Sequence, residues 1–361
     1  MRYLVTGCAG FIGWKTTELL LRSGAEVVGL DDLNDAYDVR LKQWRLELLK
    51  AFEKFQFFQA DITHTESVEK VFARPAGKRS AGSQEVLSAG EGRRRPILNG
   101  AAQGGGGAGS PGPFDAVIHL AARAGVRASV QQPEVYFRTN GLGTLVLLEA
   151  CRRHGVRKFL LASTSALYGA HNPTPYQEDA DTSRPLSPYA ASKKAAECLA
   201  YTYHYLHGLD VTVLRYFTVY GPAGRPDMSV FRFVRQIAEG EPVWIYGDGS
   251  QRRDFTYVED IARGTLAALD LQGFDVINLG GDRPVSVREL LEWIGQLVGK
   301  PVRAEHRPSH PADVPATWAD IRRAAEKLAW RPQTSLEEGL AQTVAWYQQH
   351  RSWAAQVDLG Q

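Results

Sequence analysis

A tyrosine and a lysine four positions apart are the residues of this sequence best suited to catalysis. They are Tyr189 and Lys193, in the segment Tyr-Ala-Ala-Ser-Lys. Residues four apart lie on one face of a helix, so the lysine ammonium can stabilise a phenolate and lower the pKa of the phenol from about 10 toward neutrality. Such a tyrosine can accept a proton from a substrate hydroxyl. The same spacing also occurs where a surface lysine lies beside a packed tyrosine, so the pair needs support from the rest of the chain.

Hydroxyl side chains provide part of that support. Ser163, Thr164 and Ser165 end a predicted strand, and Thr164 precedes Tyr189 by 25 residues. Ligands of open α/β sheets bind outside the carboxyl ends of the strands, so a hydroxyl there can bind a reacting oxygen. A strand that simply ends in turn-forming hydroxyls is the alternative.

A second group of residues predicts a dinucleotide site. Residues 7–13 read Gly-Cys-Ala-Gly-Phe-Ile-Gly between a predicted strand and a predicted helix. Small residues let the main chain approach a pyrophosphate, and the helix N-terminus offers free N–H groups. Asp31 follows Gly13 by 18 residues at the end of the second predicted strand. A carboxylate there accepts the ribose hydroxyls of NAD and repels a 2′-phosphate, while Asp61 and Ile62 follow the third strand, where the adenine would lie.

These residues must be positioned by a regular α/β framework. Apolar strands are expected at residues 3–6, 25–30, 55–59, 116–120, 158–163 and 211–216. Helices are expected between them at 11–23, 39–52, 135–154 and 188–207. The alternation predicts the α/β class, with a doubly wound parallel (Rossmann) sheet covered on both faces.

The C-terminal third is less regular and predicts a smaller α/β substrate lobe. Helical patterns occur at residues 229–239, 258–270, 287–297, 321–328 and 336–350, and short strands at 243–246 and 276–279. We expect the NAD-binding domain to span residues 1–217 with 251–280 returning to it. The substrate lobe is expected to comprise 218–250 and 281–350.

Residues 74–113 have a different composition from the rest of the chain. They contain 11 glycines, six Lys or Arg, two Glu and few large apolar side chains. Such a segment cannot bury enough surface to offset its ordering entropy, so we expect a disordered Gly/Arg-rich surface insertion. A tolerated loop expansion is favoured over a tether for a polyanion or a partner.

Composition excludes several classes of protein. The formal net charge of +2 gives no bias toward nucleic acid or a membrane surface. The three cysteines match no metal pattern and no disulfide framework, which favours a reduced, cytoplasmic protein without a metal. We expect neither a signal peptide nor a membrane span, because Met1 leads directly into a strand and no segment has about 18 consecutive apolar residues.

Several motifs together resemble those of the extended short-chain dehydrogenase/reductase family. TGCAGFIG, HLAARAGVR, STSALYG, YAASK, RYFTVYGPAGRPDM, RRDFTYVEDIARG and DVPATWADI occur in the family's order. The match covers nearly the whole chain except residues 74–113 and the last dozen. Among NAD-dependent nucleotide-sugar epimerases and dehydratases, the chain looks most like UDP-glucuronate 4-epimerases.

The resemblance implies a role for each matching residue. Tyr189 is the general base, Lys193 lowers its pKa and binds the ribose, and Thr164 binds the sugar O4. Arg225 and Arg253 resemble contacts to the nucleotide sugar and its diphosphate, for which charge-assisted forks are suited. The NAD-binding residues are Gly7, Gly10, Phe11, Ile12, Gly13, Asp31, Asp61, Ile62, Ala121, Ala122 and Arg123, together with Tyr189 and Lys193.

The residues beside Thr164 distinguish among the related reactions. Dehydratases of this family carry an Asp-Glu pair directly after the catalytic threonine, and UDP-glucuronate decarboxylases carry a glutamate at the second position. Here the two positions are Ser165 and Ala166, which disfavours both reactions. An epimerase needs only hydride removal at C4, turnover of the 4-keto sugar in the pocket, and hydride return from tightly bound NAD. Ser165 and Thr218 are expected to hold a uronate carboxylate, although many family members carry a further serine at the position of Ala166.

Three alternatives remain open from the sequence. The first is a 4-epimerase of UDP-glucose or UDP-N-acetylglucosamine, and the second is a non-catalytic NAD-binding protein on the same fold. The third, a nucleic-acid binder acting through the arginines of residues 74–113, ranks lowest. Related enzymes are usually homodimers, for which the two long helices after Asn140 and Pro188 would serve.

Overall fold

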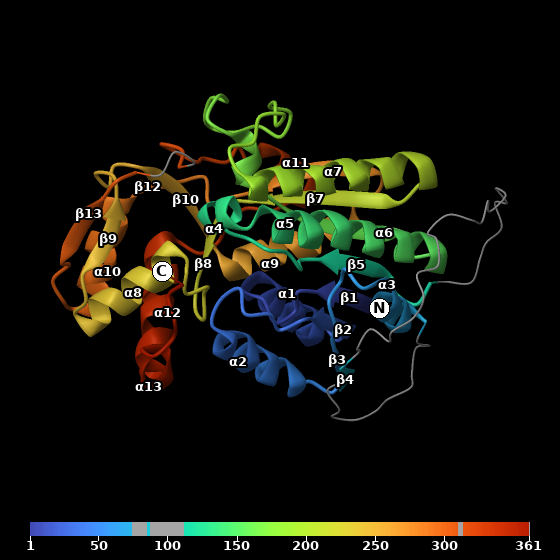
Figure 1. The fold of residues 1–361 in the computed structure, drawn as a ribbon, viewed down its shortest axis with the longest axis horizontal. Coiled ribbons are helices and arrows are strands. Elements are labelled where there is room, and N and C mark those ends of the chain that lie inside the picture. Colours follow the sequence, from blue (N-terminus) through green and yellow to red (C-terminus); the bar gives the residue numbers. More distant parts are fainter. Residues whose placement is uncertain (74–84, 87–111, 310–312, 361) are drawn as a thin grey trace.

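A large parallel sheet forms the centre of the molecule (Figure 1). The computed structural model describes residues 1–73, 85–86, 112–309 and 313–360. The strand order is β11-β7-β6-β5-β1-β2-β3-β4, and every neighbouring pair is parallel. The strands are β1 (Arg2–Thr6), β2 (Glu26–Asp31), β3 (Phe55–Gln59), β4 (Glu85–Val86), β5 (Ala116–His119), β6 (Lys158–Thr164), β7 (Asp210–Tyr216) and β11 (Phe274–Leu279).

Alternate side chains of these strands enter two different cores, as expected for a sheet covered on both faces. In β1, Tyr3 and Val5 belong to one core and Leu4 to the other. One face packs against helices that include α1 (Phe11–Arg22), α2 (Val39–Lys50) and α9 (Val258–Ala267). The other face packs against α3 (Thr65–Phe72), α6 (Gly143–His154) and α7 (Pro188–His207).

A smaller lobe lies at one end of the large sheet (Figure 1). Its strands are β8 (Thr218–Tyr220), β9 (Val243–Tyr246), β10 (Arg252–Tyr257), β12 (Pro284–Ser286) and β13 (Ala304–Arg307). They form a three-stranded sheet, β12-β10-β8, and a two-stranded sheet, β13-β9. Its helices include α8 (Ser229–Glu239), α10 (Val287–Val298), α12 (Leu336–Gln349) and α13 (Arg351–Ala354), whereas α11 (Arg322–Leu328) packs against β11 and α9 of the large-sheet part.

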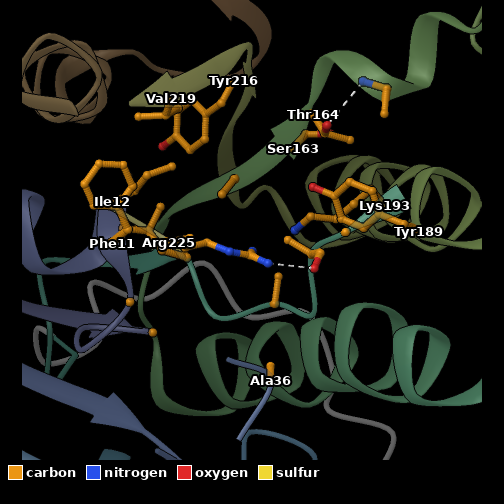
Figure 2. Close-up of a pocket in the computed structure, with 18 of the residues that line it drawn as sticks. Phe11, Ile12, Ala36, Ser163, Thr164, Tyr189, Lys193, Tyr216, Val219 and Arg225 are labelled. Carbon is orange, nitrogen blue, oxygen red and sulfur yellow. Dashed lines mark hydrogen bonds between the residues drawn. The ribbon is translucent and has the colours of Figure 1, made fainter. Parts of the chain in front are cut away.

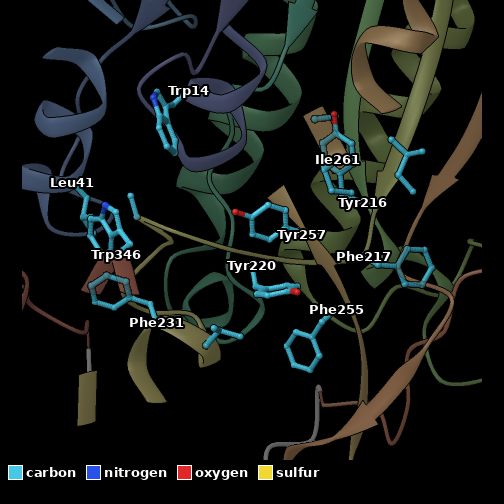
Figure 3. Close-up of a cluster of buried hydrophobic side chains, with 14 of the residues drawn as sticks. Trp14, Leu41, Tyr216, Phe217, Tyr220, Phe231, Phe255, Tyr257, Ile261 and Trp346 are labelled. Carbon is cyan, nitrogen blue, oxygen red and sulfur yellow. The ribbon is translucent and has the colours of Figure 1, made fainter. Parts of the chain in front are cut away.

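Aromatic side chains join the small lobe and the C-terminal helices to the large sheet's helices. Trp44 of α2 lies 5.7 Å from Trp14 of α1 and 5.5 Å from Trp346 of α12 by ring centroids. Figure 3 shows Trp14 above Trp346 and Phe231 in this cluster. One continuous core therefore extends across both parts of the chain.

The structure confirms the predicted α/β class and the Rossmann-type sheet. The six predicted strands of the sheet all form, and the short strand predicted at 276–279 is β11, which pairs with β7 at the edge of the same sheet. The lobe boundaries remain a proposal: residues 274–279 pair with the large sheet, while β10 pairs with β8 and β12.

Two sequence expectations need correction. The helix predicted over residues 135–154 is divided into α5 (Pro133–Tyr136), a π-helical segment over Phe137–Leu142 and α6. Within the predicted insertion, β4 pairs with β3 at the edge of the sheet. Residues 74–84 and 87–111 lie outside the described residues, so their predicted disorder stays a prediction.

Candidate active site

A cavity of about 410 Å³ lies along the carboxyl ends of the large sheet's strands. Of the predicted site residues, all except Arg123 line it. Figure 2 shows Phe11 and Ile12 on one side, Tyr189 and Lys193 on another, and Arg225 extending between them. The topology therefore brings together residues that lie more than 240 positions apart, from Gly7 to Arg253.

Glycines shape one end of the cavity because the main chain there leaves no room for side chains. Gly7 has φ +72°, and a Cβ on it would lie 2.6 Å from the main-chain N of Ala121. A Cβ on Gly13 would lie 2.0 Å from the carbonyl O of Gly7. Helix α1 begins after Gly10 with no side-chain cap and no acidic residue in its first turn. Its N-terminal N–H groups therefore suit a pyrophosphate.

Asp31 lies at the end of β2, beside this turn, and is 6% exposed. Its carboxylate accepts hydrogen bonds from Ala9 N at 3.1 Å and Leu33 N at 2.9 Å. Burial raises the pKa of Asp31, and the charge of Lys42 acts in the opposite direction. A carboxylate can accept further hydrogen bonds, and Asp61 and Ile62 line the cavity nearby. This end of the cavity fits the adenosine and pyrophosphate of NAD.

Helix α7 begins at the position that places Tyr189 at the cavity. Ser187 caps the helix by accepting a hydrogen bond from Ala190 N at 3.2 Å, and Pro188 occupies the first helical position. Both features favour a helix start. Tyr189 then lies in the first turn and Lys193 one turn later, on the same side, as predicted.

Lys193 was expected to lower the pKa of Tyr189, but the pKa of Tyr189 is raised in the structure. Burial raises the pKa of Tyr189 above its ordinary value, while the Thr164 hydrogen bond and the charge of Arg225 lower it. Burial also lowers the pKa of Lys193 to about 8, against the charge of Glu197. The expected lowering holds for a pair in a water-like environment, whereas desolvation in this buried site opposes both charged forms.

A buried ion pair fixes the end of β6 behind the catalytic residues. Arg215 donates to both carboxylate oxygens of Glu197, at 3.0 and 2.9 Å, and Ser163 donates to the same carboxylate at 2.6 Å. All three residues are at most 5% exposed. Ser163 directly precedes Thr164 in β6, and Thr164 accepts a hydrogen bond from Ala166 N at 3.2 Å. Glu197 and Arg215 are not apparent as site residues from the sequence, because their pairing joins two separate elements, α7 and β7.

Asn140 is a further residue that the sequence analysis did not identify as part of the site. It lies in the π-helical segment, fully buried, and donates to Arg123 O and Ser192 Oγ, both at 2.9 Å. Its side-chain oxygen accepts from Arg123 N at 2.9 Å. Arg123 thus contributes its main chain to the wall behind Ala121 and Ala122 instead of lining the cavity. The only sequence signal was an Asn-Gly pair inside a helical pattern.

The two predicted arginine ligands differ in their surroundings. Arg225 donates to both oxygens of Asp227, at 3.0 and 2.6 Å, and to Ala124 O at 3.0 Å. Arg253 donates to Arg252 O at 2.8 Å, and no carboxylate of the described residues lies within ion-pair distance of it. Both line the cavity with Ser165 and Thr218. Arg253 is therefore the better placed of the two to bind a diphosphate.

Comparison with known proteins agrees with this geometry. The family model described as NAD dependent epimerase/dehydratase family matches residues 110–280, and the GDP-mannose 4,6 dehydratase model matches residues 4–76. A UDP-glucuronate 4-epimerase of Thermodesulfobacterium geofontis is 50% identical over 345 residues, covering 95% of each protein.

Solved structures are similar over almost the entire chain. UDP-glucuronic acid 4-epimerase of Bacillus cereus, in complex with UDP-glucuronic acid and NAD, has a TM-score of 0.83 and 34% identity, covering 97% of this chain and 100% of that one. UDP-glucose 4-epimerase of Thermotoga maritima, with UDP-glucose, has a TM-score of 0.81 and 31% identity over the same shares. A doubly wound sheet with a glycine turn and a Tyr–Lys pair on one cavity defines an extended short-chain dehydrogenase. The chain belongs to the NAD-dependent epimerase/dehydratase family.

Among the described residues, no helix combines the length and the apolar character needed to cross a membrane. Within the same residues, no group of three or more His, Cys, Asp or Glu side chains could hold a metal ion.

Proposed function

We propose that this protein catalyses the NAD-dependent C4 epimerisation of a UDP-sugar, converting UDP-glucuronate to UDP-galacturonate through a 4-keto intermediate. The observation that carries the proposal is one cavity lined by the glycine turn with Asp31 and by Thr164, Tyr189 and Lys193. The 50% identity to a UDP-glucuronate 4-epimerase over 95% of both chains supports the choice of sugar.

The cofactor end of the cavity has the residues that NAD requires. Gly7, Gly10 and Gly13 leave space at the N-terminus of α1 for the pyrophosphate, and Asp31 offers a carboxylate to the ribose. When bound, NAD takes a hydride from C4 of the sugar and returns it to the opposite face. Because the cofactor is regenerated in each turnover, the protein should be active without added NAD.

Tyr189 is the proposed acid and base at the sugar O4. Its phenolate oxygen takes the O4 proton as the hydride leaves C4, and the resulting hydroxyl gives the proton back as the hydride returns. Thr164, which hydrogen-bonds Tyr189, orients O4. Arg225 favours the phenolate through its charge, and Lys193 provides a second positive charge while it is protonated.

Ser165 and Thr218 are the proposed ligands of the uronate carboxylate. Both line the cavity, Ser165 directly after Thr164 and Thr218 at the start of β8. A 4-keto uronate is a β-keto acid that tends to lose carbon dioxide. Holding its carboxylate near the plane of the neighbouring carbonyl weakens the orbital overlap that decarboxylation needs. Arg253 and Arg225 are the proposed ligands of the diphosphate end.

We also propose a cytoplasmic homodimer. Exposed apolar side chains lie on the π-helical segment and on α7: Phe137 and Leu142 are each 44% exposed, and Leu206 is 62% exposed. These elements pack against each other on one side of the large sheet, so a second copy could cover both. Cys8, Cys151 and Cys198 are unpaired, as is usual in a reducing compartment.

The test is the product set from UDP-glucuronate with no added cofactor, resolved by chromatography. We expect UDP-galacturonate as the main product, with little UDP-pentose. Denaturing the purified protein should release NAD. UDP-glucose and UDP-N-acetylglucosamine, assayed in parallel, should turn over far more slowly. Faster turnover of either neutral sugar would contradict the proposed substrate, and bound NAD without turnover of any UDP-sugar would contradict the enzymatic proposal.

A further inference from the structure

Arg45 of α2 is a fully buried arginine that lies outside the cavity lining. All five of its N–H groups are used, and all acceptors are neutral. It donates to Ala223 O at 3.1 and 2.6 Å, to Gly224 O at 3.3 Å, to Ala9 O at 3.1 Å and to Tyr37 Oη at 2.8 Å. No carboxylate among the described residues lies within ion-pair distance. Burying a cation without a counter-ion destabilises the folded protein. The Arg45 hydrogen bonds therefore indicate a role for this residue other than filling space in the core.

These contacts join two segments that are distant in the sequence but adjacent at the cavity. Ala9 belongs to the glycine turn of the proposed cofactor site. Ala223 and Gly224 immediately precede Arg225, whose side chain lines the cavity. Ala223 is fully buried and has φ +53°, a conformation that residues with side chains rarely adopt. The chain thereby turns so that two successive carbonyl groups face the Arg45 guanidinium.

The two segments depend on Arg45 to different extents. The glycine turn has other anchors: Gly7 N donates to Leu30 O at 2.7 Å, and Ala9 N donates to Asp31 at 3.1 Å. Among the described residues, Arg45 is the donor of every hydrogen bond to the Ala223 and Gly224 carbonyls. Arg225 itself keeps its bonds to Asp227 and Ala124 O. Loss of the Arg45 fork should therefore loosen the main chain before Arg225 and leave the glycine turn in place.

We infer that Arg45 is a positioning residue for the UDP-sugar, which acts by fixing the main chain before Arg225 against the cofactor turn. The planar fork matters because it spans three carbonyl groups at once, which a lysine ammonium at the same site does less well. This inference rests on the proposed function, since Arg225 is taken as a sugar-nucleotide ligand.

The experiment is a double-mutant cycle with Arg45→Lys and Arg225→Lys, measured on the full-length protein. Arg45→Met is made in parallel, because a neutral side chain of similar length avoids a buried ammonium. The readouts are Kd for UDP-glucuronate by calorimetry, KM and kcat, NAD content after purification, and Tm. Arg235→Lys is the matched control, since Arg235 also donates to a main-chain carbonyl, Ala355 O at 3.0 Å, away from the cavity.

We expect Arg45→Lys to raise Kd and KM for UDP-glucuronate by about tenfold, with a larger rise in Arg45→Met, because the loss of a charge-assisted fork is worth about one factor of ten or more. NAD content should stay at the wild-type level. With Lys at 225, the Arg45 variants should change Kd by no more than about twofold, the scatter found for uncoupled changes. Arg235→Lys should leave Kd and KM unchanged.

Three results would overturn the inference. The first is an equal loss of affinity in both Arg225 backgrounds, which would mean that the two residues act independently. The second is loss of NAD with unchanged sugar affinity, and the third is failure of both Arg45 variants to fold, which would make Arg45 purely structural. A wild-type protein that binds UDP-glucuronate without converting it would contradict the proposed function alone. The Kd values of the double-mutant cycle would still show whether Arg45 acts through Arg225.

Discussion

Replacing Gly13 by alanine tests the cofactor site most directly. The new Cβ would lie 2.0 Å from Gly7 O, 2.8 Å from Gly7 C and 3.1 Å from Cys8 Cα. Ordinary contact begins near 3.4 Å, so the carbonyl must move by about 1.4 Å. That carbonyl accepts a hydrogen bond from Gly10 N at 2.9 Å, so its movement deforms the start of α1. Overpacking of this kind costs about 1–3 kcal/mol. If the free energy of NAD binding becomes less favourable by about 3 kcal/mol, Kd for NAD rises about 100-fold.

The assay is NAD released from purified protein on denaturation, followed by NAD titration of the stripped protein. Gly295→Ala is a suitable control, because its Cβ would meet the end of the Val302 side chain at 2.9 Å, remote from the cavity. We expect the control to retain NAD and the Gly13 variant to lose it, with a lower Tm. A Gly13→Ala protein that kept a full complement of NAD and full activity would refute the assignment of this turn to the pyrophosphate.

Three other predictions follow from the catalytic end of the cavity. Tyr189→Phe should lower kcat by about 10²–10⁴-fold, the usual contribution of a general acid or base, with Kd for UDP-glucuronate nearly unchanged; a retained kcat would contradict the role of the phenol. Because the pKa of Lys193 is lowered to about 8, its ammonium is charged below that pH, and kcat/KM should fall as the pH rises through about 8; a profile that stays flat to about pH 9.5 would show that the charge is not needed. Thr218→Ala should increase UDP-pentose relative to UDP-galacturonate, whereas Thr218→Ser should not; loss of rate without extra pentose would rule out the proposed restraint of the carboxylate.

The large sheet could be predicted because its strands are short apolar runs bounded by turns. Phe55–Gln59 and Pro188–His207 were located with their observed bounds. In the small lobe, the strand predicted at 243–246 forms as β9, but β8, β10 and β12 were not predicted. β8 and β12 have three residues each, and β10 begins with Arg-Arg-Asp, so none has an apolar run. Their pairing is decided by tertiary contacts, which local pattern does not contain.

The site residues were predictable where a motif fixes the spacing. The glycine turn and the Tyr–Lys pair are local, and their residues line the cavity as a group. Arg45, Asn140 and Glu197 were missed because each acts through partners more than 15 positions away. The pKa of Tyr189 was misjudged for a related reason. Spacing locates the lysine, but the protonation states depend on burial, which only the three-dimensional structure reveals.

The position of β11 has a consequence for biosynthesis. Its partner β7 ends at Tyr216, while β11 begins at Phe274, 58 residues later in translation. At about 5–20 residues per second, the apolar edge formed by Val211 and Val213 waits for several seconds without its neighbour. An open edge of this kind invites pairing with other nascent chains. A chain truncated in this interval would therefore carry an open sheet edge and be prone to aggregate.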